Sequence, residues 1–474
     1  MHDFFHLKEN NTTVRTEISA GVATFMTMAY IIALNPNLLT GFGAEGQGLW
    51  NAVFLATCIS AASGTLLMGL LSNKPFAMAP GMGLNTYFAA VAASLAALTG
   101  MSYLESFRTV LVIILFEGLL FTVLSILDAR EKIVNAIPFA VRTSIGPALG
   151  TMLIHIGFGS NAGIFNSDGN SFYMMQDFFG ALGADFARSK MGDAWPAMVL
   201  TVITVFIGMA LIFYLNRRHI HGAVLLGMLG ASVIYWSCEY FFLHIDPFDS
   251  LHNVSFIPPF RDMAENTLFK YDFNGLLNIG WLTAVTLIIS FCIIDMFDTL
   301  GTLVGTATKA DMMDKNGNMP GMKGALLSDA IGTVIGSATG TSTVTTFVES
   351  AAGVAIGGRT GLTSITTAAL FMLCIFVAPL AAVIPPAATS AALIYVGISM
   401  VSTLKKLDFE NPSELVPAAI MLIAMPVSGS IGHAIGLGLI TYSAVMVMSG
   451  KAKEVPVFTW ILCVLFIIKF FFVG

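Results

Sequence analysis

Apolar runs of membrane-spanning length alternate with short polar connections along nearly the whole chain. The runs cover residues 18–39, 50–71, 80–97, 106–127, 138–158, 195–215, 222–243, 276–305, 324–338, 343–357, 361–383, 386–403, 413–428, 431–449 and 456–473. A spanning helix needs about 20 predominantly apolar residues. The pattern therefore predicts an all-α polytopic membrane protein with 14 transmembrane segments, or 15 if the last run also spans.

A long polar stretch divides the first fourteen of these runs into two sets of seven, and the run at 456–473 follows them. Because seven is odd, the second set must enter the membrane upside down relative to the first, as in transporters built from inverted repeats. We therefore expect a first repeat over 1–243, an external loop over 244–275, a second repeat over 276–450 and a C-terminal hydrophobic tail over 451–474. In such a fold the third segment mirrors the tenth.

Basic residues indicate how the chain is oriented, because Lys and Arg accumulate in cytoplasmic connections. They gather in alternate connections, at Lys74, Arg130, Lys132, Arg142, Arg217, Arg218, Lys309, Lys315, Lys323, Lys405 and Lys406. This places the N-terminus in the cytoplasm.

Two predicted segments do not resemble continuous helices. Residues 337–361, SATGTSTVTTFVESAAGVAIGGRTG, are rich in Gly, Ser and Thr and carry Glu349. Residues 72–93 open with two prolines, contain Gly81 and Gly83, and place Asn85 where the apolar helix resumes. A pair of interrupted segments at corresponding places in the two halves indicates a transporter binding site near the midplane. We expect Asn85 and Glu349 to occupy corresponding positions there, although two ordinary loops are the alternative.

Three carboxylates lie deep in these apolar surroundings. Asp295 and Asp298 are three residues apart on one helical face, and Glu349 follows a run of threonines. An ionisable residue inside the membrane is expensive and is a functional-site hypothesis by default. A helix beginning near Thr345 would direct its free N–H groups into a cavity. Glu349 could then accept two parallel N–H donors from a planar heterocycle or from a guanidinium.

Composition limits the other function classes. The chain has 474 residues, 56% of them hydrophobic and 11% charged, with a net charge of −6 and no basic stripe that would indicate a nucleic-acid partner. Its five cysteines are scattered singly, so the sequence predicts neither a disulfide nor a metal site. Neither a Walker A motif nor a nucleophile–base motif is present, which argues against a primary pump and a membrane hydrolase. We expect no enzyme activity and no cofactor.

Four long motifs resemble those of a known family. They are GVATFMTMAYIIALNP at 21–36, APGMGLNTYFA at 79–89, DMFDTLGTL at 295–303 and GTSTVTTFVESAAGVAIGGRTGLTS at 340–364. Together, and in this order, they resemble the AzgA-like purine permeases of the nucleobase–cation symporter-2, or nucleobase–ascorbate transporter, superfamily. Members import guanine and hypoxanthine, or adenine, with protons.

The resemblance implies a fold and a set of site residues. Its 14 segments form a core domain (segments 1–4 and 8–11) and a gate domain (segments 5–7 and 12–14), with short strands in the third and tenth segments. The substrate contacts carried over by motif are Asn85, Asp295, Thr299, Phe347, Val348 and Glu349. Asp298, with Asp295 and Glu349, is implied in proton coupling or support of the site.

The sequence thus predicts a proton-coupled purine importer, most simply for guanine and hypoxanthine, in a bacterial cytoplasmic (inner) membrane. We expect the purine and the lipid bilayer as partners, together with a second copy in a homodimer. Thr86, where the family pattern suggests a small Ala, leaves an adenine or other nucleobase (xanthine or uracil) permease as an alternative. An anion carrier of the same fold is disfavoured by three acids, and a cation channel by the local clustering of polar residues.

Overall fold

The computed structural model describes residues 4–41, 45–127, 138–159, 195–248, 256–309, 312, 319–428 and 431–472. In this part of the chain, eight helical stretches are long and apolar enough to cross a membrane, and four shorter apolar helices accompany them. This confirms a helical polytopic membrane protein, while the total of 14 segments stays a prediction. Arg130, Lys132, Lys315, the side chain of Lys309 and residues 249–255 of the expected external loop lie outside the described residues.

The elements of the N-terminal half begin with a helical stretch that has one turn in it. In order they are α1 (Val14–Met28), α2 (Ile31–Leu39), α3 (Gln47–Ser72), β1 (Met78–Pro80), α4 (Met82–Thr99), α5 (Tyr103–Ile126), α7 (Phe139–Phe158), α11 (Trp195–Arg217), α12 (Ala223–Cys238) and a π-helical turn η2 (Glu239–Leu243). The pattern of apolar residues predicts the first of these segments as one helix. The structure keeps Val14–Leu39 as one helical stretch of spanning length, in which Ala29 and Tyr30 form a turn with helical φ and ψ between α1 and α2.

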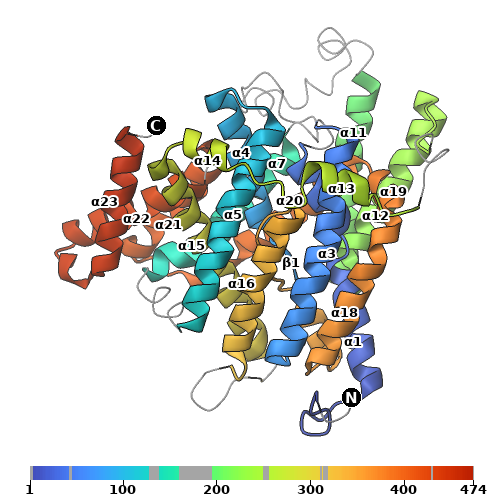
Figure 1. The fold of residues 1–474 in the computed structure, drawn as a ribbon, viewed down its shortest axis with the longest axis horizontal. Coiled ribbons are helices and arrows are strands. Elements are labelled where there is room, and N and C mark those ends of the chain that lie inside the picture. Colours follow the sequence, from blue (N-terminus) through green and yellow to red (C-terminus); the bar gives the residue numbers. More distant parts are fainter. Residues whose placement is uncertain are drawn as a thin grey trace.

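The C-terminal half follows two short helices, α13 (Phe260–Asn266) and α14 (Phe273–Asn278). It comprises α15 (Trp281–Lys309), α16 (Met322–Thr339), β2 (Val344–Thr346), α17 (Ser350–Ile356), α18 (Gly361–Leu373), η4 (Cys374–Val377), α19 (Ala378–Ala382), α20 (Pro386–Val401), η5 (Ser402–Lys406), α21 (Pro412–Ser428), α22 (Ile431–Met448), η6 (Ala452–Glu454) and α23 (Val457–Phe472). Figure 1 shows α21–α23 at one end of the molecule and α1, α3 and α18 towards the other.

The two interrupted segments meet through their strands. β1 and β2 pair antiparallel, with Met78 opposite Thr346, Ala79 opposite Thr345 and Pro80 opposite Val344. Two further bonds extend the ladder, from Gly81 N to Thr343 O and from Phe347 N to Ala77 O, each 3.0 Å long. All six strand residues are buried. Non-helical backbone at membrane depth is tolerated when its polar groups are satisfied inside the protein. The ladder satisfies the facing edges of the strands, and Thr65 and Thr333 bond groups on the outer edges. The predicted short strands are therefore confirmed.

The helices pack in two groups. In the first, α3 contacts α16 and α18, α5 contacts α16, and α1 contacts α17 and α18. In the second, α7 contacts α20, α21 and α22, and α11 contacts α12 and α20.

Glycines bring the helix backbones close together within each group. A Cβ on Gly69 of α3 would lie 2.7 Å from Gly361 O, and a Cβ on Gly397 of α20 would lie 2.6 Å from Gly150 O. Small residues of this kind are typical of membrane helix interfaces, where close van der Waals packing replaces the hydrophobic effect.

Candidate functional site

Glu349 lies at the junction between β2 and α17. The structure begins α17 at Ser350, with Glu349 as its N-cap residue, and not near Thr345 as the sequence predicts. The reason is that Val344, Thr345 and Thr346 are taken up by strand pairing with β1. Glu349 is half-buried, and Val348 beside it is 58% exposed. The junction therefore lies at the edge of the packed core.

Residues at the turn between α1 and α2 contact Glu349. The hydroxyl of Tyr30 donates a 2.9 Å hydrogen bond to Glu349 Oε1. The hydroxyl of Thr27 lies 3.4 Å from the main-chain oxygen of Glu349, although its nearest acceptor is Thr24 O at 2.8 Å. Tyr30 itself is fully buried. Glu349 is thus held from the protein side, while its other side remains partly accessible.

A buried polar cluster joins α15, α16 and β2. Thr299 Oγ1 lies 2.6 Å from Asp329 Oδ1, 3.2 Å from Asp295 Oδ1 and 2.6 Å from Thr345 Oγ1. All four side chains are at most 1% exposed. A hydroxyl has one proton to donate and two lone pairs, so Thr299 can donate to only one of these neighbours at a time. The cluster therefore has alternative hydrogen-bond arrangements.

Asp298 faces the other strand–helix junction. A Cβ placed on Gly81, the N-cap residue of α4, would lie 3.5 Å from Asp298 Oδ2. Asp298 is half-buried. The start of a helix carries a partial positive charge that favours a carboxylate. Helix α15 therefore supports both broken segments, through Asp298 beside α4 and through Thr299 beside β2.

Asn85 is turned towards the strand pair. Its Nδ2 donates to Pro80 O at 3.1 Å, and its Oδ1 accepts a hydrogen bond from the hydroxyl of Ser342. It is fully buried and stands one turn inside α4, whereas Glu349 caps α17. The expectation that the two residues occupy corresponding positions is therefore wrong, because α17 starts later after its strand than α4 does.

Other polar side chains hold the strand pair in place. Glu117 Oε2 of α5 accepts a 2.6 Å hydrogen bond from Thr343, and the hydroxyl of Ser350 accepts one of 2.9 Å from Ala77 N. Phe347, predicted to stack on a ligand, is 6% exposed and belongs to the main hydrophobic core. These contacts support the frame on which Glu349 and Val348 are presented.

The structure therefore brings most of the predicted residues to one place. Asp295, Asp298 and Thr299 from α15 and Val348 and Glu349 from the β2–α17 junction surround the strand pair. Neither Tyr30 nor Asp329 is among the site residues expected from the sequence. A signal existed for each: Tyr30 lies within the first family-like motif, and Asp329 is a lone carboxylate in an otherwise uncharged helix interior.

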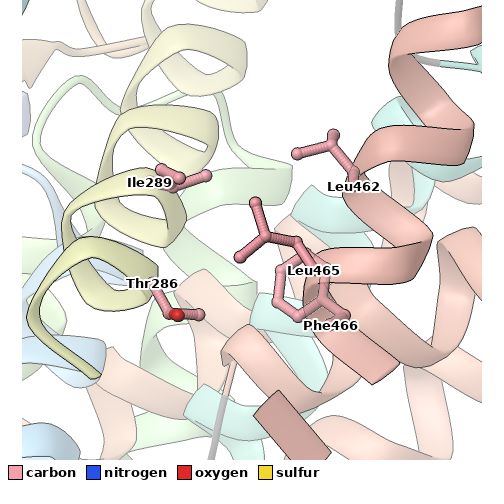
Figure 2. Close-up of a pocket in the computed structure, with 5 residues that line it drawn as sticks. All are labelled: Thr286, Ile289, Leu462, Leu465 and Phe466. Atoms are coloured by element: carbon pink, nitrogen blue, oxygen red, sulfur yellow. The ribbon is translucent and has the colours of Figure 1, made fainter. Parts of the chain in front are cut away.

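An apolar hollow elsewhere does not belong to this site. It lies between α15 and α23 and is lined by Thr286, Ile289, Leu462, Leu465 and Phe466 (Figure 2). Thr286 donates its hydroxyl to Leu282 O at 2.7 Å, and the other four lining side chains are apolar. Thr286 is nine residues before Asp295, or about 13 Å along the helix at 1.5 Å per residue. Within the described residues, no group of three His, Cys, Asp or Glu side chains could hold a metal ion.

Known proteins share this sequence and fold. A family model described as "Permease family" (Xan_ur_permease) matches residues 15–431. The guanine/hypoxanthine permease PbuG of Bacillus subtilis is 34% identical over 100% of both chains. The adenine permease AdeP of Escherichia coli is 34% identical over 99% of this chain and 95% of its own.

The fold is also known from a solved structure. The transmembrane domain of the cyanobacterial bicarbonate transporter BicA superposes with a TM-score of 0.61 at 15% identity, covering 88% of this chain and 97% of that one. At this identity the likeness concerns the fold alone. The sequence relatives carry the family assignment and confirm the resemblance seen in the four motifs. The chain therefore belongs to the nucleobase–ascorbate transporter family of membrane permeases.

Proposed function

We propose that the protein imports purine nucleobases, guanine and hypoxanthine by preference, across the bacterial cytoplasmic membrane by proton symport. The observation that carries this proposal is the Glu349 carboxylate, which is half-buried at a strand–helix junction inside the membrane and bonded to Tyr30 through one oxygen. A carboxylate accepts two parallel N–H donors. Guanine offers such a pair on its ring N1 and its 2-amino group, and hypoxanthine offers the ring N–H.

The same proposal assigns roles to the other residues. Asp295 and Thr299 line the site from α15, Val348 contacts the ring, and Asn85 and Phe347 hold the strand pair that presents Glu349. The proton is carried at Asp295, Asp298 or Glu349, because carboxylates inside a membrane have few other ways to be accommodated. The buried cluster around Thr299 supports this assignment, since its hydroxyl joins carboxylates from two helices.

We further propose that the fold is a 14-segment inverted repeat. Three contacts between mirrored segments support it. The third and tenth segments pair through β1 and β2. A Cβ on Gly332 of the ninth would lie 3.5 Å from Gly64 Cα of the second, and a Cβ on Gly397 of the twelfth would lie 2.6 Å from Gly150 O of the fifth. Mirrored segments are expected to meet in this way around a pseudo-two-fold axis.

The two helix groups suggest how transport occurs. Segments 1–4 and 8–11 correspond to the first group and carry all the proposed site residues, and segments 5–7 and 12–14 correspond to the second. We propose that the first is a core that moves against the second, the gate, by an elevator-like or rocking motion. Gly83 of α4 faces this boundary, where a Cβ would lie 2.7 Å from Leu149 Cδ1 of α7.

Uptake of radiolabelled hypoxanthine by cells that lack their own purine carriers tests the function. We expect saturable accumulation that guanine competes with, that a protonophore abolishes and that replacing sodium leaves unchanged. Competition by adenine alone would favour the second candidate, an adenine permease, which the similarity to AdeP supports equally well. Absence of uptake for every purine would contradict the proposal.

A further inference from the structure

One face of α1 follows the α17–α18 hairpin along its whole length. At the start of α1, the buried carboxylate of Glu17 accepts hydrogen bonds from the backbone N–H groups of Arg359 (2.9 Å), Thr360 (3.2 Å) and Thr363 (3.2 Å). The Thr363 hydroxyl adds a fourth bond of 2.6 Å. Glu17 therefore satisfies three of the backbone donors that precede and open α18.

The contact continues at helical spacing. A Cβ on Gly21 would lie 2.7 Å from Thr363 O, and a Cβ on Gly353 of α17 would lie 2.6 Å from Ala20 O and would also collide with Thr24 Oγ1. Glu17, Gly21 and Thr24 are three to four residues apart and so share one face of α1. The backbones of α1 and α17 are thus in direct contact, and α17 cannot shift without α1.

Tyr30 lies just beyond the C-terminal end of α1. It lies in the turn between α1 and α2, three residues after Thr27, and its side chain is fully buried. Its hydroxyl meets Glu349 Oε1 at 2.9 Å. Because the rest of α1 is tied to α17 and α18, the distance between the Tyr30 hydroxyl and the Glu349 carboxylate is set by backbone packing and not by a flexible side chain.

We propose that Tyr30 is a positioning residue for the substrate site, holding the Glu349 carboxylate so that Oε2 and the remaining lone pair of Oε1 face the purine. This inference rests on the proposed function of Glu349. A carboxylate that already has one fixed donor loses less conformational freedom when a ligand binds, so less of the binding energy is spent on ordering it. Tyr30 acts through Glu349 and does not touch the substrate.

Tyr30→Phe tests the proposal because it removes the hydroxyl and keeps the ring. Hydrogen bonds to charged groups contribute about 1.5–3 kcal/mol, so we expect the KM for radiolabelled hypoxanthine (or adenine, if that is the transported base) to rise about tenfold. The maximal uptake rate should change by less than about twofold, since the carboxylate itself remains. An unchanged KM would overturn the proposal.

Tyr103→Phe is the matched control. Tyr103 donates its hydroxyl to Leu39 O at 2.7 Å, at the far end of α2 from Tyr30. Its loss removes a phenol hydrogen bond of the same kind without touching Glu349, so the KM should stay at the wild-type value. An equal rise of KM in both variants would mean that Tyr30 acts only by stabilising the fold, and would overturn the positioning role.

Binding of labelled hypoxanthine or adenine to purified protein shows whether the effect runs through Glu349. In the Glu349→Gln background, we expect Tyr30→Phe to add less than about twofold to the dissociation constant, because coupled residues are not additive. A full further tenfold loss would contradict the proposal. If Tyr30→Phe does not fold, Glu349→Asp is the alternative variant, because the shorter side chain moves the carboxylate away from the Tyr30 hydroxyl. We expect it to raise the KM in the same way. An unchanged KM would overturn the proposal.

Failure of the proposed function can be told apart from failure of this inference. If wild-type protein neither binds nor takes up a purine, the proposed function fails. Labelling of Glu349 by dicyclohexylcarbodiimide, followed by mass spectrometry, still reports on the pair without any substrate. We expect faster labelling in Tyr30→Phe than in wild type or Tyr103→Phe, because the carboxylate has lost its fixed partner. Equal labelling rates would overturn the role of Tyr30.

Discussion

The two strand–helix units, β1–α4 and β2–α17, are similar in outline and different in chemistry. In both, a three-residue strand leads into a helix at the same two-stranded ladder. The first unit continues as an 18-residue helix, and its polar side chain, Asn85, is bonded to Pro80 O and Ser342. The second continues as a seven-residue helix and presents the half-buried Glu349 at its start.

This difference separates support from recognition. Asn85 uses its amide to hold the end of β1 to the residues before β2, so it contributes to the frame. Glu349 has one oxygen on Tyr30 and remains partly accessible. A mirrored fold therefore need not place equivalent chemistry on both sides of its site. The Glu349 side chain of the β2–α17 unit makes fewer hydrogen bonds within the protein than the Asn85 side chain of the β1–α4 unit, so the β2–α17 unit is the one available to a ligand.

The largest effect is expected at Glu349. Glu349→Gln keeps the size of the side chain and replaces one acceptor oxygen by an NH₂ group, which would meet an N–H of the substrate donor to donor. Losing a charged hydrogen bond and leaving a buried donor unpaired costs about 3 kcal/mol or more, so uptake efficiency should fall at least about 100-fold. Initial rates of labelled hypoxanthine uptake check this, with Glu454→Gln, an exposed acid outside the site, as the control. Wild-type uptake in Glu349→Gln would remove the basis of the comparison.

A second effect is expected on the frame of the β2–α17 unit. Gly353→Ala inserts a methyl group against Ala20 O and Thr24 of α1. Overpacking of this kind costs about 1–3 kcal/mol, so the apparent melting temperature in detergent should fall. Ala352→Ser is the control, because it adds an atom to the neighbouring residue of α17. Gly280→Ala would not serve, because the φ of Gly280 is +81° and alanine would be strained there. A melting temperature unchanged from wild type would show that α1 and α17 are less tightly joined than this contact indicates.

Asn85→Ala tests the other unit. Removing the amide leaves Pro80 O and the Ser342 hydroxyl without this partner. We expect a loss of stability of about 1–2 kcal/mol, measured as a lower apparent melting temperature, with a smaller change in hypoxanthine affinity. The opposite result, a raised KM with normal stability, would place Asn85 against the ring, as the sequence predicts, and would make the two units functionally alike.

The smallest effect is expected at Val348. Its side chain is 58% exposed beside Glu349, so a bound ring would cover part of it. Val348→Ala removes about one buried methylene equivalent, or about 0.8 kcal/mol, and should raise the KM about three- to fourfold without changing the maximal rate. Val457→Ala, in the exposed part of α23, is the control. A KM within error of wild type would limit the recognised surface to Glu349 and α15.

Several features of the site could be predicted from residue patterns alone. Gly, Pro and Thr interrupt two apolar runs, which indicates broken segments whatever their surroundings. Asp295 and Asp298 share a helical face because helix geometry is local. Residue patterns could not show whether Asn85 and Glu349 occupy equivalent positions in their two strand–helix units. That equivalence depends on where each helix begins, and the residues before α17 have a choice between helix and strand that only pairing with β1 resolves.

The sequence by itself determined that this is a helical membrane protein, where its apolar segments lie and which carboxylates are buried among them. These are consequences of local composition and of the length needed to cross a bilayer. Only the tertiary structure decided what each carboxylate meets. Tyr30 and Glu349 are 319 residues apart, and Thr299 and Asp329 are 30 apart. Such partners are brought together by the packing of whole helices, and a one-dimensional pattern contains no measure of that distance.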